Sequence, residues 1–266
     1  MKNFLIKLNN KYKFSLENLI QKYIIVNHGG TRGVVLHVGG NFGQEAEIYD
    51  RSGFTSVIWI EGYPKFAEIL KKKIKYKDHH KLITAMISDR PNEIVNFSIA
   101  SNTGSSTALK VTDSWKKTFK EINMVKQVKI KCVRLDYILK LHNLDGKIDF
   151  LVLDVEGSEL KVLTSLGYFI KNIKFALVEV SLRKNYFGGP LLTDIDNYFV
   201  KNKFKRIYIK TGPASGDALY KKCKYLGCQE KLVMLCSAYL FVTLSFLRLT
   251  DLFQYFIHFV RGKFKL

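Results

Sequence analysis

The strongest constraint on the fold is a series of five short apolar runs, rich in β-branched residues, that alternate with stretches of helical pattern. Strands that alternate with helices pair in parallel, and the helices then cover both faces of the sheet. The chain is therefore predicted to fold as an α/β domain around a parallel sheet. The predicted strands are Val34–Val38, Ser56–Ile60, Leu82–Ile87, Phe150–Val155 and Phe175–Val180.

Two further regions are predicted to add strands to this core. Glu93–Ala100 and Val128–Val133 alternate more loosely and flank a loop rich in serine and threonine, Ser101–Thr107, which indicates an inserted pair of strands or a lid. After the fifth run, a helix is predicted near Leu192–Lys201. A closing antiparallel hairpin is then predicted around Gly212 and Pro213, from the segments Lys205–Lys210 and Ala218–Lys222.

Both ends of the chain differ from this central domain, which is predicted to span residues 34–225. Residues 1–33 carry scattered apolar positions after a Ser15 opening, and they are predicted to form a helical cover. Residues 226–266 form an apolar tail with basic flanks, predicted to be helical. Its uncharged stretch Leu232–Leu247 has 16 residues, whereas about 20 are needed to span a bilayer. The tail is interpreted either as a peripheral membrane anchor or as a helix packed on the domain or on a second subunit.

The charge balance leaves several classes of partner open. The chain has 43 Lys and Arg against 23 Asp and Glu, a formal net charge of +20, which attracts anionic lipids, glycans or nucleic acid. The excess is spread along the chain, so a general compositional bias explains it equally well. The four cysteines lack the spacing of a zinc site, and the N-terminus lacks a secretory apolar segment. We therefore expect free thiols, no metal, and a cytoplasmic protein with membrane association left open.

A glycine turn follows the first predicted strand and leads into a helical pattern. Gly39, Gly40 and Gly43 allow the backbone to approach a ligand, and the following helix offers N–H donors. Their spacing does not match the GxGxxG fingerprint of dinucleotide sites. The second strand ends in Glu61, which is predicted to accept hydrogen bonds from both hydroxyls of a ribose. Ser88 and Asp89 follow the third strand and are predicted to meet an adenine edge.

Carboxylates also follow the fourth predicted strand. Asp154 and Glu156 lie at its carboxyl end, where ligands bind in an open α/β sheet. They are candidates for the proton acceptor in a transfer to a hydroxyl, and the alternative is that they only organise the loop. Ser158 is predicted to cap the next helix, which Gly167 would end. Glu179 ends the fifth strand and is a candidate for the acceptor pocket or a partner for Lys or Arg.

These segments resemble the FkbM-type family of class I S-adenosylmethionine-dependent methyltransferases. The resemblance covers about residues 34–181, and its most specific block is Asp149–Glu159, which contains D-x-E-G-x-E. It implies a Rossmann-like fold with a mostly parallel seven-stranded sheet, an antiparallel C-terminal hairpin and helices on both faces. It also implies S-adenosylmethionine as cofactor, bound by His37, Gly39, Gly40, Asn41 and Gly43. His37 stands where the family usually has Asp.

The resemblance implies O-methyl transfer to a hydroxyl, on a sugar of a glycan, a lipid-linked oligosaccharide or a secondary metabolite. A nucleic-acid methyltransferase is the first alternative, favoured by the net charge. It is disfavoured because the fourth strand ends in Asp-Val-Glu-Gly rather than Asn/Asp-Pro-Pro-aromatic, and because no RNA-binding module is recognisable. The second alternative is a non-catalytic membrane- or partner-binding module on a methyltransferase fold.

Overall fold

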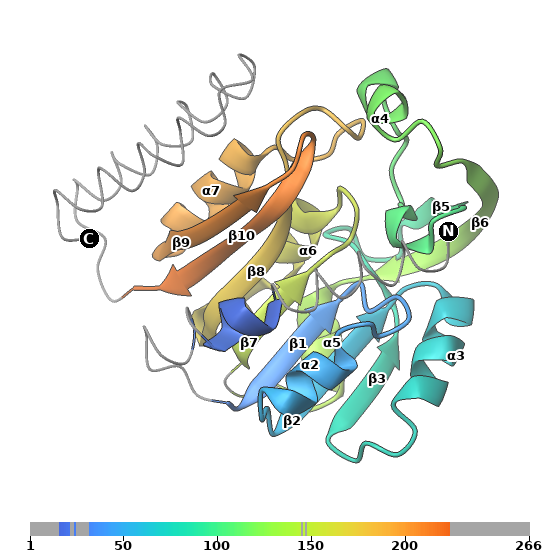
Figure 1. Ribbon diagram of the computed structural model, residues 1–266. Helices are drawn as coiled ribbons and strands as arrows, with labels where there is room; N and C mark the ends of the chain where they lie inside the picture. The colour runs from blue at the N-terminus through green and yellow to red at the C-terminus, as the bar shows by residue number, and fades with distance from the viewer. Residues whose placement is uncertain (1–15, 22–23, 25–31, 145, 147, 224–266) are drawn as a thin grey trace, which may run out of the picture.

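A seven-stranded sheet forms the centre of the computed structural model, which describes residues 16–21, 24, 32–144, 146 and 148–223 (Figure 1). The strand order is β3-β2-β1-β7-β8-β10-β9, in which β10 alone runs antiparallel to its two neighbours. This is the mostly parallel sheet with an antiparallel C-terminal hairpin that the sequence predicts. The strands are β1 Val34–Val38, β2 Ser56–Glu61, β3 His80–Thr84, β7 Ile148–Leu153, β8 Ile173–Ser181, β9 Phe204–Thr211 and β10 Ser215–Lys222.

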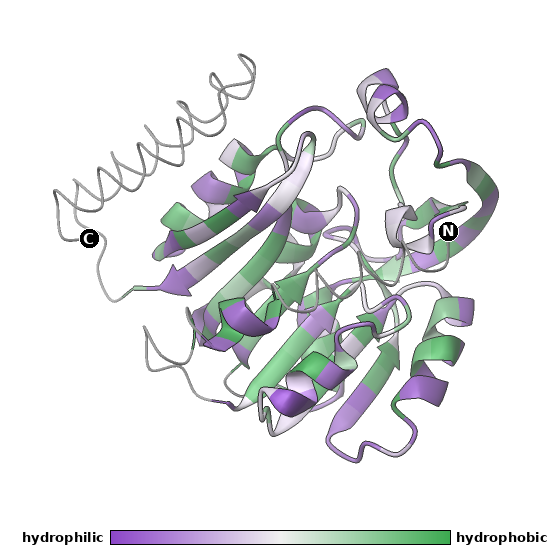
Figure 2. Ribbon diagram, in the orientation of Figure 1, coloured by the Kyte–Doolittle hydropathy of each residue, from purple (hydrophilic) through white to green (hydrophobic). Residues whose placement is uncertain are grey.

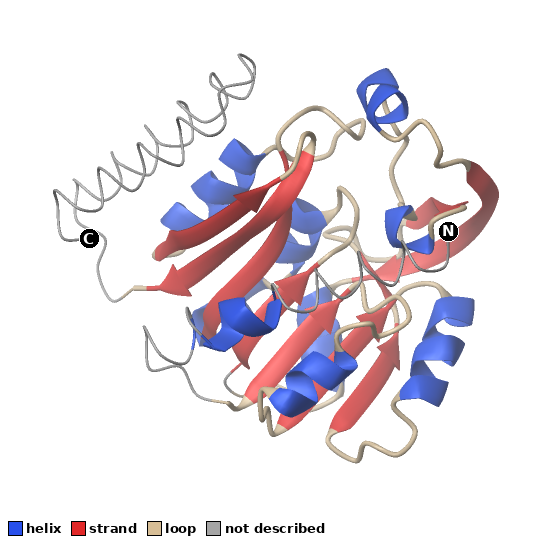
Figure 3. Cartoon of the chain, viewed as in Figure 1, coloured by secondary structure: helices blue, strands red, loops and turns tan. Residues whose placement is uncertain are grey.

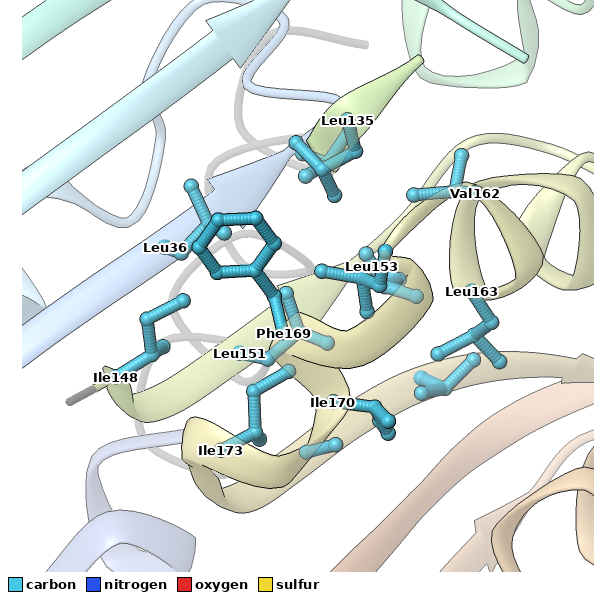
Figure 4. Packing of buried hydrophobic residues seen from close by; sticks show 14 of the residues in the cluster. Leu36, Leu135, Ile148, Leu151, Leu153, Val162, Leu163, Phe169, Ile170 and Ile173 are labelled. Atoms are coloured by element: carbon cyan, nitrogen blue, oxygen red, sulfur yellow. The ribbon is translucent and has the colours of Figure 1, made fainter. Parts of the chain in front are cut away.

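One face of the sheet is covered by α5 (Leu135–Leu141), α6 (Glu159–Ser165) and α7 (Leu192–Lys201), together with the 3-10 helix Gly167–Asn172. Figure 4 shows how apolar side chains of α5, α6 and the 3-10 helix meet those of β1 and β7. Alternate strand residues point to this face because side chains in a strand have a period of two. The residues labelled there are Leu36, Leu135, Ile148, Leu151, Leu153, Val162, Leu163, Phe169, Ile170 and Ile173, all buried.

The opposite face is covered by α2 (Ala46–Arg51), α3 (Pro64–Lys73) and part of the N-terminal segment. In Figure 2 the central strands are mostly green, whereas α3 carries both colours, as expected for an amphipathic helix. Within the predicted cover, four of the described residues are buried against this second face. These are Leu16, Leu19, Ile20 and Ile24.

A second, three-stranded sheet lies beyond the carboxyl ends of β1, β2 and β3, whose arrowheads point toward it (Figure 3). It consists of β4 (Met86–Ile87), β5 (Ile94–Ala100) and β6 (Met124–Val133), with β5 antiparallel to β6. The inserted strand pair is thus confirmed. The loop between β5 and β6 contains the 3-10 helix Thr103–Ser105 and α4 (Asp113–Thr118).

The prediction of one strand over Leu82–Ile87 is wrong. The chain pairs with β2 as far as Thr84, and the N–H of Ala85 then donates to the carbonyl of Glu61 at 2.9 Å. From Met86 the chain pairs in parallel with β6 instead. The apolar run is continuous in sequence, but its first part belongs to the main sheet and its last two residues belong to the second sheet.

The predicted tail, residues 226–266, lies outside the described residues, as does most of the predicted cover. Both therefore stay predictions. Among the described residues, no helix combines the length and the apolar character needed to cross a membrane.

Candidate active site

A cleft opens at the carboxyl ends of β1, β2 and β7, where the order of the main sheet reverses direction. Such a switch point is the expected ligand site of an open α/β sheet. The β1 and β7 strand ends contribute the polar residues His37, Asn41, Asp154 and Glu156, and β2 contributes Glu61. The far wall comes from the loop after β5, with Thr103, Gly104 and Ser106, and from Phe66, Ala85, Met86, Ile87, Phe97 and Ala108.

Glu61 joins the two loops that form the floor of this cleft. Its side chain is buried, and its carboxylate accepts hydrogen bonds from the N–H of Asn41 and the N–H of Tyr63, both at 2.7 Å. Burial raises the pKa of Glu61 to about 7, although these N–H donors act in the opposite direction. The N–H of Gly62 also acts on this carboxylate, and its two oxygens have about four acceptor sites, so the predicted contact with the ribose remains compatible with this geometry.

The three glycines shape the turn rather than bind through their N–H groups. The N–H groups of Gly39 and Gly40 both donate to the carbonyl of Ile60, and that of Gly43 donates to the carbonyl of Gly40. Only Gly39 among them lines the cleft. Gly40 and Gly43 pack against Leu70 of α3, where a Cβ atom would lie 2.9 and 2.3 Å from its side-chain carbons. The predicted N–H donors belong to the start of the following helix, so they stay a prediction, as does cofactor binding by these glycines.

Two polar atoms of the cleft residues have no hydrogen-bond partner within the described part of the chain. They are Nε2 of His37 and Oδ1 of Asn41, and both atoms are buried. Buried polar atoms of this kind are rare without a partner, because each costs about 1–3 kcal/mol when unsatisfied. Because both residues line the cleft, these atoms are candidates for hydrogen bonds to a ligand.

Ser88 and Asp89 are not brought to the cleft. The Ser88 hydroxyl is buried and donates to Glu93 at 2.7 Å, and the carbonyl of Asp89 accepts from Arg134 at 3.0 Å. The neighbouring residues Met86 and Ile87 line the cleft in their place. The predicted adenine contact stays a prediction, but this geometry engages both residues in the scaffold.

The loop after β7 is organised by a residue to which the sequence analysis gave no role. Glu159 is buried, and its Oε1 accepts hydrogen bonds from the N–H of Gly157 at 3.0 Å and of Val155 at 3.3 Å. The expected side-chain cap by Ser158 is absent at the start of α6. Glu156 has a positive φ of 49°, and its carboxylate accepts a hydrogen bond from the Tyr186 hydroxyl. Glu159 holds the loop, and Asp154 and Glu156 are left facing the cleft.

A second cleft, of about 320 Å³, adjoins the first and shares Asp154 and Glu156 with it. Glu179 of β8 and Asp217 of β10 also line it, since the two are paired across the antiparallel ladder. We call these four carboxylate residues the acid cluster. One carboxylate oxygen from each of Asp154, Glu156 and Glu179 lies within 4.8 Å of the other two. Such spacing would also accommodate a divalent cation, and the expected absence of a metal stays a prediction.

A family model described as the methyltransferase FkbM domain matches residues 37–206, more than half of the chain. The chain belongs to the FkbM methyltransferase family. The chain is accordingly an S-adenosylmethionine-dependent methyltransferase, and the cleft is where its cofactor fits. The unpartnered atoms of His37 and Asn41 and the carboxylate of Glu61 are the groups in this cleft that we expect to contact the cofactor.

Several solved structures are similar to this FkbM methyltransferase at low sequence identity. M. capricolum TrmK in complex with S-adenosylhomocysteine is 12% identical, over 82% of this chain and 72% of that chain, with a TM-score of 0.43. Fibrillarin from Aeropyrum pernix with bound S-adenosylmethionine is 9% identical, over 77% and 74%, with a TM-score of 0.45. The N-terminal domain of EvdMO1 with S-adenosylhomocysteine bound is 8% identical, over 81% of both chains, with a TM-score of 0.43. No curated protein matches the chain.

The acid cluster of this FkbM methyltransferase holds its protons more tightly than exposed carboxyls do. Burial raises the pKa of Glu156 to about 8 and that of Asp217 to about 6. The pKa values of Asp154 and Glu179 are also raised. The largest cause is the loss of hydration at these carboxyls, and the second is repulsion from neighbouring carboxylates. Asp154 is nevertheless exposed into the cleft. The cluster therefore favours a positive charge or a hydrogen-bond donor beside it.

A separate polar cluster lies at the start of β3, where Nε2 of His79 and Nε2 of His80 lie 2.9 and 2.8 Å from Oδ1 of Asp50. The Trp59 indole donates to Nδ1 of His80 at 3.0 Å. Because an indole N–H is only a donor, Nδ1 of His80 must be an acceptor, and Nε2 carries the proton. A protonated Nε2 cannot bind a metal ion, so His80 acts here as a hydrogen-bond donor to Asp50.

Proposed function

We propose that this methyltransferase transfers the methyl group to a hydroxyl oxygen of a sugar, carried by a glycan, a lipid-linked oligosaccharide or a secondary metabolite. The observation that carries the proposal is the second cleft, lined by the acid cluster and adjoining the cofactor cleft. Lys210, Thr211 and Ser215 also line it. Carboxylates accept hydrogen bonds from hydroxyls, and hydroxyl and ammonium groups can donate to sugar oxygens. This mixture suits a ligand with several hydroxyls.

The bound cofactor supplies an electrophilic methyl group on a sulfonium. In the transfer, the acceptor oxygen forms a bond to the methyl carbon, the carbon–sulfur bond breaks with its electron pair going to sulfur, and the hydroxyl proton must leave. Glu156 is the proposed proton acceptor. The Tyr186 hydroxyl holds its carboxylate at the boundary of the two clefts, and a pKa near 8 makes it an effective base near neutral pH.

The acid cluster also argues against the nucleic-acid alternative. A nucleic acid brings phosphates, which each ionised carboxyl of the acid cluster would repel, whereas a neutral sugar meets no such repulsion in either protonation state of the cluster. The test is methyl transfer to a panel of mono- and oligosaccharides, with RNA and nucleosides as a counter-panel. Production of S-adenosylhomocysteine together with an O-methylated sugar supports the proposal. Transfer only to RNA, or binding of cofactor without transfer to any member of the panels, contradicts it.

Glu156→Gln is expected to lower kcat by about 100-fold or more, because loss of a general base typically costs 10²–10⁴-fold. Its affinity for S-adenosylhomocysteine should stay within about threefold, since the amide keeps the shape and the hydrogen bond from Tyr186. Steady-state kinetics and calorimetry measure the two effects separately. Glu179→Gln is the matched control: it makes the same change in the same cluster, and it should raise KM for the acceptor while kcat changes only a few-fold. Equal losses of kcat in both variants would remove Glu156 from its assigned role.

A further inference from the structure

His37 presents a buried nitrogen to the cofactor cleft with nothing in the described chain to bind it. The side chain is 2% exposed, and its ring stacks on Trp59 with centroids 4.8 Å apart. On one side, Nδ1 lies 2.9 Å from the hydroxyl of Tyr49. On the other side, Nε2 has no partner, and His37 is one of the residues that line the cleft. The ring is thus fixed by its neighbours, with one nitrogen left for a ligand.

The neighbours of His37 also decide which nitrogen carries the proton. Tyr49 is fully buried, and burial raises the pKa of its hydroxyl, which therefore keeps its proton. Within the described chain this hydroxyl has Nδ1 of His37 as its hydrogen-bond partner, so the hydroxyl donates and Nδ1 accepts. Burial lowers the pKa of His37 to about 3, which keeps the ring neutral. A neutral ring that accepts at Nδ1 has its hydrogen on Nε2, so His37 offers an N–H donor to the cleft.

Three backbone N–H groups next to His37 in sequence are already engaged. Those of Gly39 and Gly40 donate to the carbonyl of Ile60, and that of Asn41 donates to Glu61. An acceptor group of the cofactor near β1 therefore cannot rely on these backbone donors. The imidazole N–H of His37, in contrast, is a donor held in a fixed orientation at the end of β1.

The chemistry of the cofactor then limits which of its atoms can accept this hydrogen bond. Its ammonium and sulfonium groups carry positive charge and offer no strong acceptor, and the carboxylates of Asp154 and Glu45 on the same cleft suit that charge. Its ribose is expected at Glu61, on the β2 side. The carboxylate of its amino-acid end is the strong acceptor that remains for β1. We propose that the Nε2–H of His37 donates a hydrogen bond to this carboxylate, so that His37 recognises the amino-acid end of the cofactor.

This inference rests on the cofactor alone and does not depend on the identity of the methyl acceptor. Its test compares two ligands that differ only by the carboxylate: S-adenosylhomocysteine and its decarboxylated analogue, S-adenosyl-3-thiopropylamine. Both are titrated by calorimetry into two variants, Tyr49→Phe and the double variant Tyr49→Phe with His37→Phe. Both variants lack the Tyr49 hydroxyl, so no buried hydroxyl is left unpaired, and they differ only in the imidazole.

Loss of the imidazole is expected to weaken S-adenosylhomocysteine binding by about 10- to 100-fold, as for other hydrogen bonds to charged groups, and to change binding of the analogue by less than about threefold. Equal losses for both ligands, or no loss for either, would overturn the proposal. Failure of the unmodified protein to bind S-adenosylhomocysteine would instead overturn the cofactor assignment.

A second pair of variants keeps the test valid if the double variant does not fold. The amide nitrogen of His37→Gln reaches about as far as Nε2, whereas that of His37→Asn reaches only as far as Nδ1. His37→Gln should keep most of the preference for the ligand with a carboxylate, and His37→Asn should lose it. The same preference in both variants would contradict the proposal. Nitrogen-15 spectra of the unmodified protein should also show the Nε2–H form of His37 throughout the neutral pH range.

Discussion

Gly39→Ala is expected to destabilise the domain by at least about 3 kcal/mol and to lower the affinity for S-adenosylhomocysteine by about 100-fold or more. A Cβ atom at Gly39 would lie 1.8 Å from the carbonyl oxygen of Asp154, and the φ of +91° is a region that favours glycine. That carbonyl belongs to the loop after β7, which also carries Glu156. The substitution would therefore push apart the two strand ends that form the cleft. Denaturant unfolding and calorimetry measure the two effects.

Gly188→Ala is the matched control for this substitution. Gly188 has a similar φ of +74°, but a Cβ atom at this position would meet no atom of the described residues within 4 Å. Its substitution should lower the free energy of unfolding only by the cost of backbone strain, about 1–2 kcal/mol, and should leave the affinity for S-adenosylhomocysteine unchanged. If the two variants lose equal stability, the cost at Gly39 comes from its backbone conformation and not from the contact with Asp154.

Glu61→Ala is expected to lower the affinity for S-adenosylhomocysteine by about 100-fold and to cost about 2–4 kcal/mol of folding stability. The substitution leaves the N–H groups of Asn41 and Tyr63 without their acceptor, so the two loops of the cleft floor lose their connection. It also removes the oxygens expected to bind the ribose. Calorimetry and thermal unfolding measure these losses.

Glu68→Ala removes the same group from an exposed position on α3, and both quantities should stay close to those of the unmodified protein. An effect of Glu61→Ala no larger than that of Glu68→Ala would show that the cleft floor does not depend on the carboxylate.

The pH dependence of binding gives a further test of Glu61. Because its pKa is raised to about 7, the carboxyl gains a proton as the pH falls below that value and then loses acceptor capacity. Affinity for S-adenosylhomocysteine should therefore fall as the pH is lowered from about 8 to about 6. Glu61→Gln should have a weaker pH dependence in this window. Identical profiles would assign the effect to other carboxyls of the cleft.

Much of the fold follows from local patterns along the chain. The strand at Ser56–Glu61 is a short apolar run, and the acidic residue at its end is predicted to face a ligand; the structure places Glu61 in the cleft. The helix Leu192–Lys201 is predicted with the bounds that the structure has. The secondary structure of such segments depends on residues close by in the sequence, so the apolar periodicity and the ends of the apolar runs are enough to locate them.

Other features depend on segments far apart in the sequence. Asp217 joins the acid cluster because its strand pairs with β8 in a register that places it beside Glu179. The motif alone does not separate the roles of Asp154, Glu156 and Glu159, since the hydrogen bonds from Val155 and Gly157 decide which one holds the loop. The sequence analysis explains Gly39 by the close approach of a ligand. In the structure, the carbonyl of Asp154 already leaves no room for a Cβ atom at this position.

The acid cluster also gives the two forms of the cofactor different electrostatic environments. Methyl transfer converts a cationic sulfonium into a neutral thioether, and Asp154 and Glu156 of the cluster line the cofactor cleft as well as the second cleft. The attraction between that positive charge and the cluster therefore disappears with the methyl group. Because the pKa values of the cluster are raised, this attraction grows as its carboxyls ionise, so the preference for S-adenosylmethionine over S-adenosylhomocysteine is expected to increase with pH.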